Sequence, residues 1–255
     1  MSTPDGLESE RGLLFDSVGD LYDIARPHYP TALYDAIAEL IPPPANALEI
    51  GAGSGQATVD LAQLGYHVIA IEPGPRMAAL LLQKLVVFPN CQIWTGRFED
   101  WNEETKFDLV TGGTSLHWLE LATMPRRVAA VMRPGGILAP FWGEFKNLPE
   151  FQAGLDRVYE RHPGGYSAGS HRGEVLGAIE TSGLFSSLPE VTTAVDLSYT
   201  TDQYLRLVQT FSETLAMSAN ERESFIEEIR WVIDQEFDGR IPKKFVTTLS
   251  PFRLK

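Results

Sequence analysis

Three glycines at alternating positions carry the clearest chemical signal in this chain. They are Gly51, Gly53 and Gly55, within the segment ALEIGAGSGQAT. Apolar residues run up to Ile50 and a helical apolar pattern follows, so the segment predicts a strand, a tight turn and a helix. Glycine tolerates positive φ angles and lets a ligand approach the backbone, and the N-terminus of the following helix presents free N–H groups. In doubly wound sheets such a turn, at the carboxyl end of the first parallel strand, binds nucleotides.

The spacing of these glycines separates two classes of ligand. A dinucleotide-binding turn reads G-x-G-x-x-G, and its third glycine packs the helix against the strand. Here the spacing is G-x-G-x-G, and Gln56 takes the position of that third glycine. Glu49 stands two residues before Gly51, where a carboxylate would repel a pyrophosphate and would suit a cationic ligand. A glycine turn without a ligand is the alternative, because a lone glycine pattern is a weak signal.

With Glu49 included, this segment resembles the first motif, E/D-x-G-x-G-x-G, of the class I S-adenosylmethionine-dependent methyltransferases. Two further segments, LYDIARPHYP with Tyr22, Arg26 and Tyr29, and the string LHW at 116–118, are similar to the subgroup that includes trans-aconitate methyltransferase. The resemblance covers residues 15–145 well and the remainder only by the order of its elements. It implies S-adenosylmethionine as the cofactor and a small-molecule acceptor, with a carboxylic acid as one candidate.

Glu72 ends the second predicted strand, about 20 residues beyond the glycine turn. A carboxylate at that position can accept both ribose hydroxyls of a nucleoside, and an ordinary surface acid is the alternative. Met77 lies shortly after it, and we expect its side chain either to pack on the adenine face or to belong to the core.

The segment GRFEDW, residues 96–101, follows the third predicted strand. The resemblance implies an acid here for the adenine amino group, followed by a backbone N–H for a ring nitrogen. The simplest alignment puts Arg97 at the acid position, which departs from the common pattern. We therefore expect Phe98 to supply the N–H and Glu99 the carboxylate, with Asp100 as the second choice and a solvated acidic turn as the alternative.

The segment TGGTSLHW, residues 111–118, follows the fourth predicted strand, where a doubly wound sheet opens its crevice. Backbone carbonyls around Thr114 can hold the cofactor ammonium. We expect His117 and Trp118 to open the next helix, close to the sulfonium and the acceptor. His117 is a candidate catalytic base because an ordinary histidine titrates near pH 6.5. A histidine that only packs or shapes the pocket is the alternative.

The remaining site candidates are Tyr22 and Arg26, for contact with the cofactor or the pocket. Arginine offers a bidentate fork to a carboxylate, here that of the cofactor or of an acceptor. The alternative is an arginine that ties the N-terminal helix to the sheet. Five other residues are weaker candidates for the acceptor pocket: Trp142, Phe145, His162, Tyr166 and His171.

Composition bounds the possible partners. The chain has 255 residues, 44% hydrophobic and 22% charged, with a net charge of −13. This balance argues against nonspecific nucleic-acid binding, which needs basic surface. The single cysteine, Cys91, cannot form an internal disulfide, and we expect it in a buried strand. No apolar run is long enough to span a membrane, and the polar, acidic N-terminus lacks the features of a signal peptide. We expect a cytoplasmic protein without membrane partners.

The elements that must position these residues alternate between strands and helices. We expect a disordered tail at 1–12 and a single domain over 13–255. Within it, residues 13–46 form N-terminal cap helices, the second capped by Thr31, and residues 47–145 form the cofactor-binding core. Alternation of this kind predicts an α/β fold, a doubly wound, seven-stranded, mostly parallel Rossmann-like sheet.

The segment 146–255 should complete the sheet and shape the acceptor pocket. The resemblance implies a sixth strand followed by an antiparallel seventh that inserts beside the fifth, and the segments 191–200 and 244–249 fit these two. Between them we expect a helical insert with helices at 202–211 and 221–237.

Two rival functions remain open on sequence grounds. An NAD(P)-dependent oxidoreductase would need the dinucleotide spacing that Gln56 does not provide. A non-catalytic S-adenosylmethionine-binding regulatory protein stays open because methyl transfer needs few catalytic residues. Neither a hydrolase elbow, a Walker lysine nor a spacing typical of metal ligands is present.

Overall fold

The computed structural model describes residues 13–163 and 171–255, so the expected disordered tail at 1–12 and Tyr166 lie outside the described residues. Its centre is a mixed sheet with the strand order β3-β2-β1-β4-β5-β8-β7. The parallel part consists of β1 (Asn46–Ile50), β2 (His67–Glu72), β3 (Gln92–Thr95), β4 (Phe107–Gly113) and β5 (Met132–Asn147). This order confirms the predicted doubly wound architecture.

The last two long strands complete the sheet as expected. β8 (Arg240–Leu249) inserts between β5 and β7 (Val191–Thr200) and is antiparallel to both. β8 begins four residues earlier than predicted, since its polar first half still alternates with buried Ile241 and Lys243. Two short strands were not predicted: β6 (Phe185–Ser187) and β9 (Phe252–Leu254), which pair with each other while β9 also pairs with β5.

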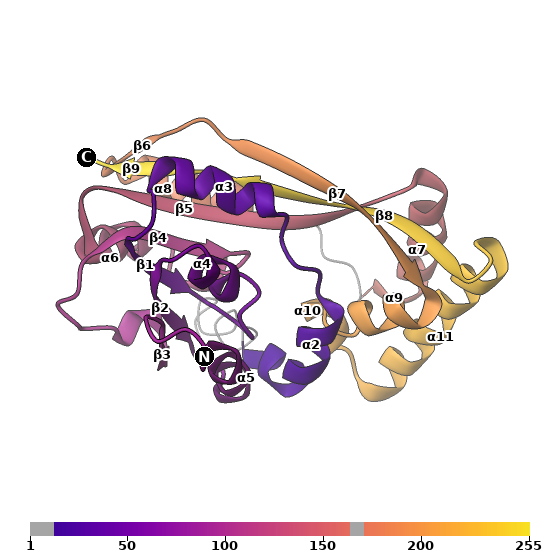
Figure 1. Ribbon diagram of the computed structural model, residues 1–255. Helices are drawn as coiled ribbons and strands as arrows, with labels where there is room; N and C mark the ends of the chain where they lie inside the picture. Colours follow the sequence, from indigo (N-terminus) through magenta and orange to yellow (C-terminus); the bar gives the residue numbers. More distant parts are fainter. Residues whose placement is uncertain (1–12, 164–170) are drawn as a thin grey trace, which may run out of the picture.

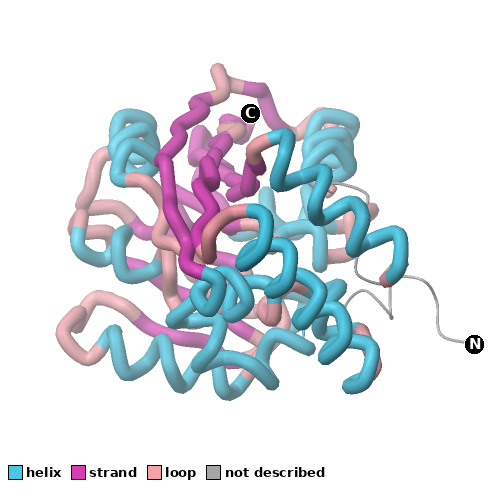
Figure 2. The backbone as a smooth tube through the Cα atoms, turned by 90° about the vertical axis from the view of Figure 1, so that its right-hand side faces the viewer, coloured by secondary structure: helices cyan, strands magenta, loops and turns pink. Residues whose placement is uncertain are grey.

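Helices cover both faces of the sheet, as Figure 2 shows. One face carries α3 (Thr31–Leu40), α4 (Thr58–Gln63) and α5 (Pro75–Leu85), and the other carries α6 (Met124–Val131) and α8 (Arg172–Thr181). The central strands are buried on both faces, as parallel strands usually are. Two separate clusters follow from this, one around Leu33, Ile37 and Phe141 and the other around Leu48, Val110 and Val128.

A helical insert occupies one end of the molecule. It comprises α7 (Pro149–Arg161), α9 (Thr201–Val208), α10 (Ser212–Ala216) and α11 (Ala219–Glu236). Figure 1 shows β5, β7 and β8 extending past the parallel core to reach it. The predicted helix at 202–211 is interrupted after Val208, where the Thr210 hydroxyl donates to the Leu207 carbonyl at 2.7 Å and helps close a turn.

The N-terminal segment lies between the core and the insert (Figure 1). It forms a 3₁₀ turn, η1 (Leu13–Val18), and α2 (Gly19–Ala25) before α3. Thr31 is the first residue of α3 and not its cap, which corrects the prediction. Pro30 takes the N-cap position with an extended backbone, and no side chain caps this helix.

Two expectations drawn from the composition concern the place of Cys91 and membrane-spanning segments. Cys91 precedes β3 instead of lying within it, because its N–H closes a turn onto the Phe88 carbonyl at 3.0 Å. Burial raises the pKa of its thiol. Among the described residues, no helix has the length and apolar character required to cross a membrane.

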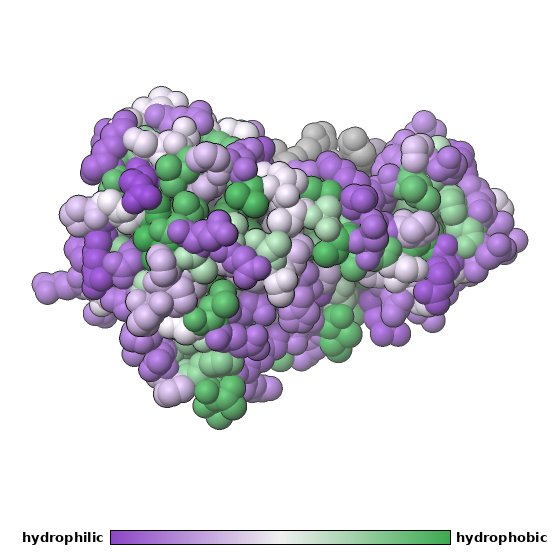
Figure 3. All heavy atoms as spheres, turned by 45° about the horizontal axis from the view of Figure 1, so that its top comes forward, coloured by the Kyte–Doolittle hydropathy of each residue, from purple (hydrophilic) through white to green (hydrophobic). Residues whose placement is uncertain are grey.

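The surface gives little guidance to a ligand site. The face seen in Figure 3 mixes hydrophilic and hydrophobic side chains over both the core and the insert. The candidate residues gather instead at the carboxyl ends of the parallel strands, where such sheets bind their ligands.

Candidate active site

The glycine turn after β1 has the backbone that only glycine adopts readily. Gly51, Gly53 and Gly55 have φ angles of +71°, +58° and +95°. A Cβ on Gly51 would lie 2.6 Å from the Ser115 Cβ, and one on Gly55 would collide with Leu81. A Cβ on Gly53 would meet nothing closer than 3.8 Å. Gly51 and Gly55 thus serve packing, whereas Gly53 leaves its backbone open to a ligand.

Glu72, at the end of β2, faces this turn. One carboxylate oxygen accepts the Gly53 N–H at 2.8 Å and the other accepts the Gly74 N–H at 2.8 Å. The side chain is 8% exposed, and burial raises its pKa although both N–H groups oppose the shift. The two hydrogen bonds fix the carboxylate beside Gly53, where its remaining lone pairs can accept further donors. Its role with a ribose stays a prediction.

Glu49 is buried on β1, with its carboxylate held by the Thr58 hydroxyl at 2.6 Å. Burial raises its pKa to about 8, partly offset by that hydrogen bond. The group is therefore mostly neutral at pH 7, and a nearby cation would favour its ionised form.

The first turn of α5 is capped from a distance by the N-terminal segment. Asp16 of η1 accepts the N–H groups of Arg76 and Met77 at 2.8 and 2.9 Å. These are orphan donors of the helix, which a carboxylate satisfies well. The Met77 side chain is 2% exposed and belongs to the buried interior. Asp16 gave no signal in the sequence, because it lies 60 residues from its partners.

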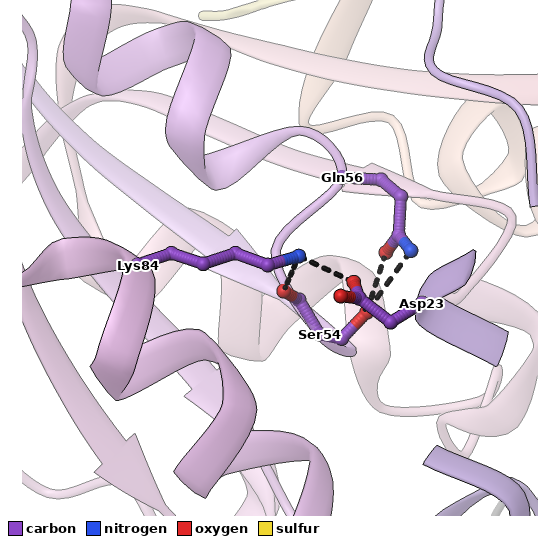
Figure 4. Close-up of polar contacts among 4 residues, drawn as sticks. All are labelled: Asp23, Ser54, Gln56 and Lys84. Carbon is purple, nitrogen blue, oxygen red and sulfur yellow. Dashed lines mark hydrogen bonds and ion pairs between the residues drawn. The ribbon is translucent and has the colours of Figure 1, made fainter. Parts of the chain in front are cut away.

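A second contact between the N-terminal segment and the glycine turn is drawn in Figure 4. The Asp23 carboxylate of α2 accepts a hydrogen bond from the Ser54 hydroxyl at 2.7 Å and forms an ion pair with Lys84 of α5. Lys84 also donates to the Ser54 carbonyl at 2.8 Å, and the Gln56 amide donates to the Ser54 hydroxyl at 3.0 Å. Gln56 thus stabilises the turn from within, in place of the third glycine of a dinucleotide site.

The turn after β3 is the 3₁₀ element η2 (Phe98–Asp100). The Gly96 N–H bonds to the Glu72 carbonyl at 3.1 Å, which brings this turn alongside the end of β2. The Phe98 side chain is buried, whereas Glu99 is half-buried and Asp100 exposed. Their roles toward an adenine stay predictions.

Thr114, just after β4, is a strained residue. Its φ is +53°, which is unusual for a β-branched side chain. Its N–H donates to the Phe141 carbonyl at 2.8 Å and its hydroxyl accepts the Gly143 N–H at 3.2 Å. These bonds hold the strain at the carboxyl ends of β4 and β5, and strain of this kind clusters at functional sites.

His117 and Trp118 do not open the next helix, which corrects the prediction. They form a separate 3₁₀ turn, η3 (Leu116–Trp118), and α6 begins at Met124. The His117 ring stacks on His171, with centroids 5.1 Å apart, and its Nδ1 is buried without a hydrogen-bond partner among the described residues. Burial, and then the neighbouring His171, lower the pKa of His117 to about 4. It is neutral at pH 7 and a weak base.

Arg26 binds the helical insert. It donates to the Thr210 hydroxyl at 2.9 Å and carbonyl at 2.8 Å, and its guanidinium lies 4.9 Å from the ring centroids of both Tyr22 and Phe211. It thus ties the N-terminal segment to the turn after α9, whereas the sequence alternative tied it to the sheet. Tyr29 stacks edge-on against Phe141 at 4.8 Å, over β5.

The weaker acceptor-pocket candidates separate in space. Phe145 is half-buried beside Phe211 and Phe245, and His171 contacts His117. Trp142 points to the opposite face of the sheet, since side chains alternate along β5, and it is buried in the cluster under α6 and α8. His162 bonds to Glu228 at 3.1 Å within the insert. No group of three metal-ligating side chains occurs among the described residues.

The fold is that of a known class of proteins. A sheet of this order, with a glycine turn after β1 and a buried acid at the end of β2, has the architecture of the class I S-adenosylmethionine-dependent methyltransferases. The chain is similar over 89% of its length to a solved structure from Anaeromyxobacter dehalogenans described as a type II methyltransferase. The TM-score is 0.69, the sequence identity is 22% and 97% of that chain is covered.

Sequence comparisons agree with the fold. Residues 47–136 match the family model described as a methyltransferase domain. An uncharacterized methyltransferase of Mycobacterium tuberculosis is 33% identical over 135 residues, which cover 52% of this chain and 53% of that protein. A Saccharomyces cerevisiae protein named as an S-adenosylmethionine-dependent methyltransferase is 28% identical over 142 residues, covering 51% of this chain and 47% of that protein.

Residues 47–136 are therefore similar to known methyltransferase domains, on a fold shared with a solved methyltransferase structure. The chain matches about half the length of these curated relatives. The segment that the family model matches, residues 47–136, includes the glycine turn, Glu72 and η3, and it excludes the N-terminal segment and the insert.

Proposed function

We propose that the protein transfers a methyl group from S-adenosylmethionine to a small-molecule acceptor. The observation that carries this proposal is the pair of Gly53 and Glu72, an open backbone position and a fixed carboxylate 2.8 Å from it. A nucleoside needs such a pair, one for close approach and one for its ribose hydroxyls. Gln56 and Glu49 favour a cationic nucleoside over a dinucleotide.

The chain offers donors and acceptors for each part of the cofactor. Glu72 would accept the ribose hydroxyls, and the turn at Phe98 and Glu99 would meet the adenine. Glu49 and the carbonyls near Thr114 would surround the ammonium. When bound, the cofactor would supply an electrophilic methyl group on a sulfonium, so that an acceptor bond to the methyl carbon would form in line as the carbon–sulfur bond breaks and a neutral thioether leaves. Met77 and Arg26 would act indirectly, through the packing of α5 and through the tie to the insert.

The proposed small-molecule acceptor fits the acidic chain, which is unsuited to the phosphates of a nucleic acid. A carboxylic acid remains the simplest acceptor, because its carboxylate is already a nucleophile. His117 matches this, since a base with a pKa near 4 gains little from accepting a phenol proton. Most of the acceleration would come from aligning the nucleophile, methyl and sulfur and from excluding water.

Calorimetry with S-adenosylhomocysteine and with NADH tests the cofactor. We expect S-adenosylhomocysteine to bind and NADH not to bind; the reverse would favour an oxidoreductase and overturn the proposal. A screen of acceptors with labelled S-adenosylmethionine tests transfer. Tight S-adenosylhomocysteine binding with a silent screen would favour a non-catalytic regulatory protein instead.

Two substitutions of His117, to Ala and to Gln, test its role at saturating cofactor. Because His117 is a weak base, we expect the Gln variant to keep most of its turnover and the Ala variant to lose more, through lost packing against His171. A large and equal loss in both variants, relieved by raising the pH, would instead assign proton transfer to His117.

A further inference from the structure

Lys243 of β8 is a buried amine in an aromatic surrounding. It is 5% exposed, and it shares its face of the strand with Ile241 and Phe245. Its nitrogen lies 4.5 Å from the ring centroid of Tyr204, 4.9 Å from that of Phe145 and 5.9 Å from that of Phe151. It donates a hydrogen bond to the Tyr204 hydroxyl at 3.4 Å.

This amine has no counter-charge in the described part of the chain. No carboxylate oxygen there lies within 4.0 Å of its nitrogen, although the next residue, exposed Lys244, pairs with Asp196 at 3.1 Å. Burial lowers the pKa of Lys243 to about 7. Cation–π contacts contribute up to about 2 kcal/mol each, whereas burying an ammonium costs several kcal/mol. A leucine or methionine would therefore be more stable at this position.

A row of half-buried rings leads from the cofactor half to this lysine. We call this row the aromatic arc, and its members, in spatial order, are Trp118, Phe15, Tyr22, Phe211, Phe145 and Tyr29. Neighbouring rings contact each other directly, except that Arg26 lies between Tyr22 and Phe211 and Phe245 lies between Phe145 and Tyr29. All six rings are half-buried, so each keeps part of its surface accessible. Tyr29, Phe145 and Phe211 also pack against the core with part of their surface, whereas the core rings Phe141 and Phe151 are fully buried at 0% exposure.

Phe145 belongs to both features, since it contacts the arc through Phe211 and the amine through its own ring. The arc begins beside η3, which follows β4, and Lys243 lies on β8, two strands further along the sheet. Two strand spacings correspond to about 10 Å. Lys243 also pairs with Asn147, six residues or about 20 Å along β5 from Phe141, which lies opposite the end of β4. A planar ring with one polar substituent therefore fills only the Lys243 end of this distance, and the arc offers stacking faces for an elongated molecule that continues toward the cofactor half.

We propose that the aromatic arc binds the acceptor and that Lys243 binds a carboxylate carried by an aromatic ring. The proposal rests on the methyltransferase function above and names its substrate class. The ring would stack on the arc, and its carboxylate would lie against the Lys243 ammonium and the Tyr204 hydroxyl. A second nucleophilic group at the other end of the same molecule, a further carboxylate in the simplest case, would receive the methyl group. The bound carboxylate would supply the counter-ion that the described part of the chain lacks.

The test uses the full chain saturated with S-adenosylhomocysteine and a panel of monocyclic aromatic carboxylates. The panel contains benzoate, salicylate, 4-hydroxybenzoate, phenylacetate and cinnamate, each compared with its neutral carboxamide and with cyclohexanecarboxylate. Dissociation constants are measured by ligand-observed NMR for the wild-type protein, Lys243→Met and the matched control Lys244→Met. Thermal unfolding of each variant is measured alongside.

We expect at least one aromatic carboxylate to bind ten-fold or more tightly than its carboxamide and than cyclohexanecarboxylate. Lys243→Met should remove the preference for the carboxylate while unfolding at the same or a higher temperature, and Lys244→Met should keep the preference. Equal binding of acid and amide, an unchanged preference in Lys243→Met, or no binding by the whole panel would overturn the inference. Failure of S-adenosylhomocysteine itself to bind would overturn the proposed function instead.

Discussion

The two halves of the molecule bury ionisable groups of opposite kinds, acids in one half and a base in the other. In the cofactor half, Glu72 is held by two backbone N–H groups and Glu49 by a hydroxyl, and both are acids near a turn that suits a cation. In the insert half, Lys243 is a base among aromatic rings. Each half therefore contains a buried ionisable group whose ordinary charge is opposite to that of the ligand group expected there.

The comparison shows how differently the two sites are specified. The cofactor half uses backbone geometry, which depends on local sequence and tolerates few residue types. The insert half uses side chains brought together from β5, β8, α7 and α9. Substitutions in the glycine turn of the cofactor half should lower both the stability of the fold and the cofactor affinity. Substitution of Lys243 in the insert half should leave the fold intact.

The largest effect is expected from Gly51→Ala. Its Cβ would meet Ser115 at 2.6 Å on a backbone with φ +71°, and we expect a loss of about 3 kcal/mol or more of unfolding free energy in urea. Gly53→Ala is the control, because its Cβ would make only an ordinary contact, with the Gln56 side chain at 3.8 Å. It should lose only about 1–2 kcal/mol from its φ angle but bind S-adenosylhomocysteine much more weakly. Equal destabilisation of both variants would contradict the division of roles.

Lys243→Met should change the pH dependence of stability. The folded chain releases the Lys243 proton near pH 7, whereas the unfolded chain holds it up to about pH 10. The unfolded state thus binds more protons between these values, so stability rises with pH across the window. The facing phenols of Tyr204 and Tyr199 have raised pKa values through burial and stay neutral there. The methionine variant should lose this rise and gain about 1–4 kcal/mol at pH 7; chemical denaturation at several pH values measures both.

Glu72→Gln should weaken S-adenosylhomocysteine binding by about 10- to 100-fold, the effect of hydrogen bonds to a charged group worth about 1.5–3 kcal/mol. Calorimetry measures it. Asp108→Asn is a matched control at the other end of the sheet, where Asp108 accepts the Asn46 N–H and pairs with Arg133. It should lower stability and leave the affinity unchanged. Unchanged binding by Glu72→Gln would remove Glu72 from the site.

Glu49→Gln should show the opposite pH behaviour to Lys243→Met. The folded chain keeps the Glu49 proton up to about pH 8, whereas the unfolded chain loses it near pH 4.5. Stability therefore falls between these values, with Glu72 and Asp60 as the charges facing the group. The glutamine variant should lack this fall and weaken cofactor binding by roughly 1 kcal/mol. A pH series of unfolding curves, repeated with S-adenosylhomocysteine, distinguishes the two contributions.

The smallest effect is expected from Asp23→Asn. Its ion pair with Lys84 is partly exposed, at 24% and 31% of the two side chains, and such pairs contribute about 0–1 kcal/mol. We expect a small loss of stability, reduced further at high salt, and a change in S-adenosylhomocysteine affinity of about three-fold or less. A larger effect on affinity than on stability would show that α2 controls the glycine turn.

The sequence predicted the cofactor half because its signals are local. The glycine spacing predicted a tight turn, in which all three glycines have positive φ angles, and the strand pattern predicted Glu72 at the end of β2. The place of β7 and β8 followed from the family resemblance. β6 and β9 were missed because each has three residues, too few for a periodic pattern.

The insert half was harder to read because its contacts join distant parts of the chain. Arg26 and Thr210 are 184 residues apart, and Lys243 and Tyr204 are 39 apart. One signal for Lys243 was present. It occupies the apolar phase of the alternation in RIPKKF, between Ile241 and Phe245, where a lysine is unexpected.

β5 belongs to both halves at once. Its first part pairs with β4, up to Gly113 opposite Phe141, and its last part pairs with β8, with Phe145 opposite Phe245. The methyl donor and the acceptor would therefore both bind beside one continuous strand. The number of residues between Phe141 and Phe145 would fix the distance between their two sites. Adding a single residue there would turn Phe145 to the far side of the sheet. Substitutions of Phe145, by contrast, would change which acceptor is methylated and would leave the position of the methyl donor unchanged.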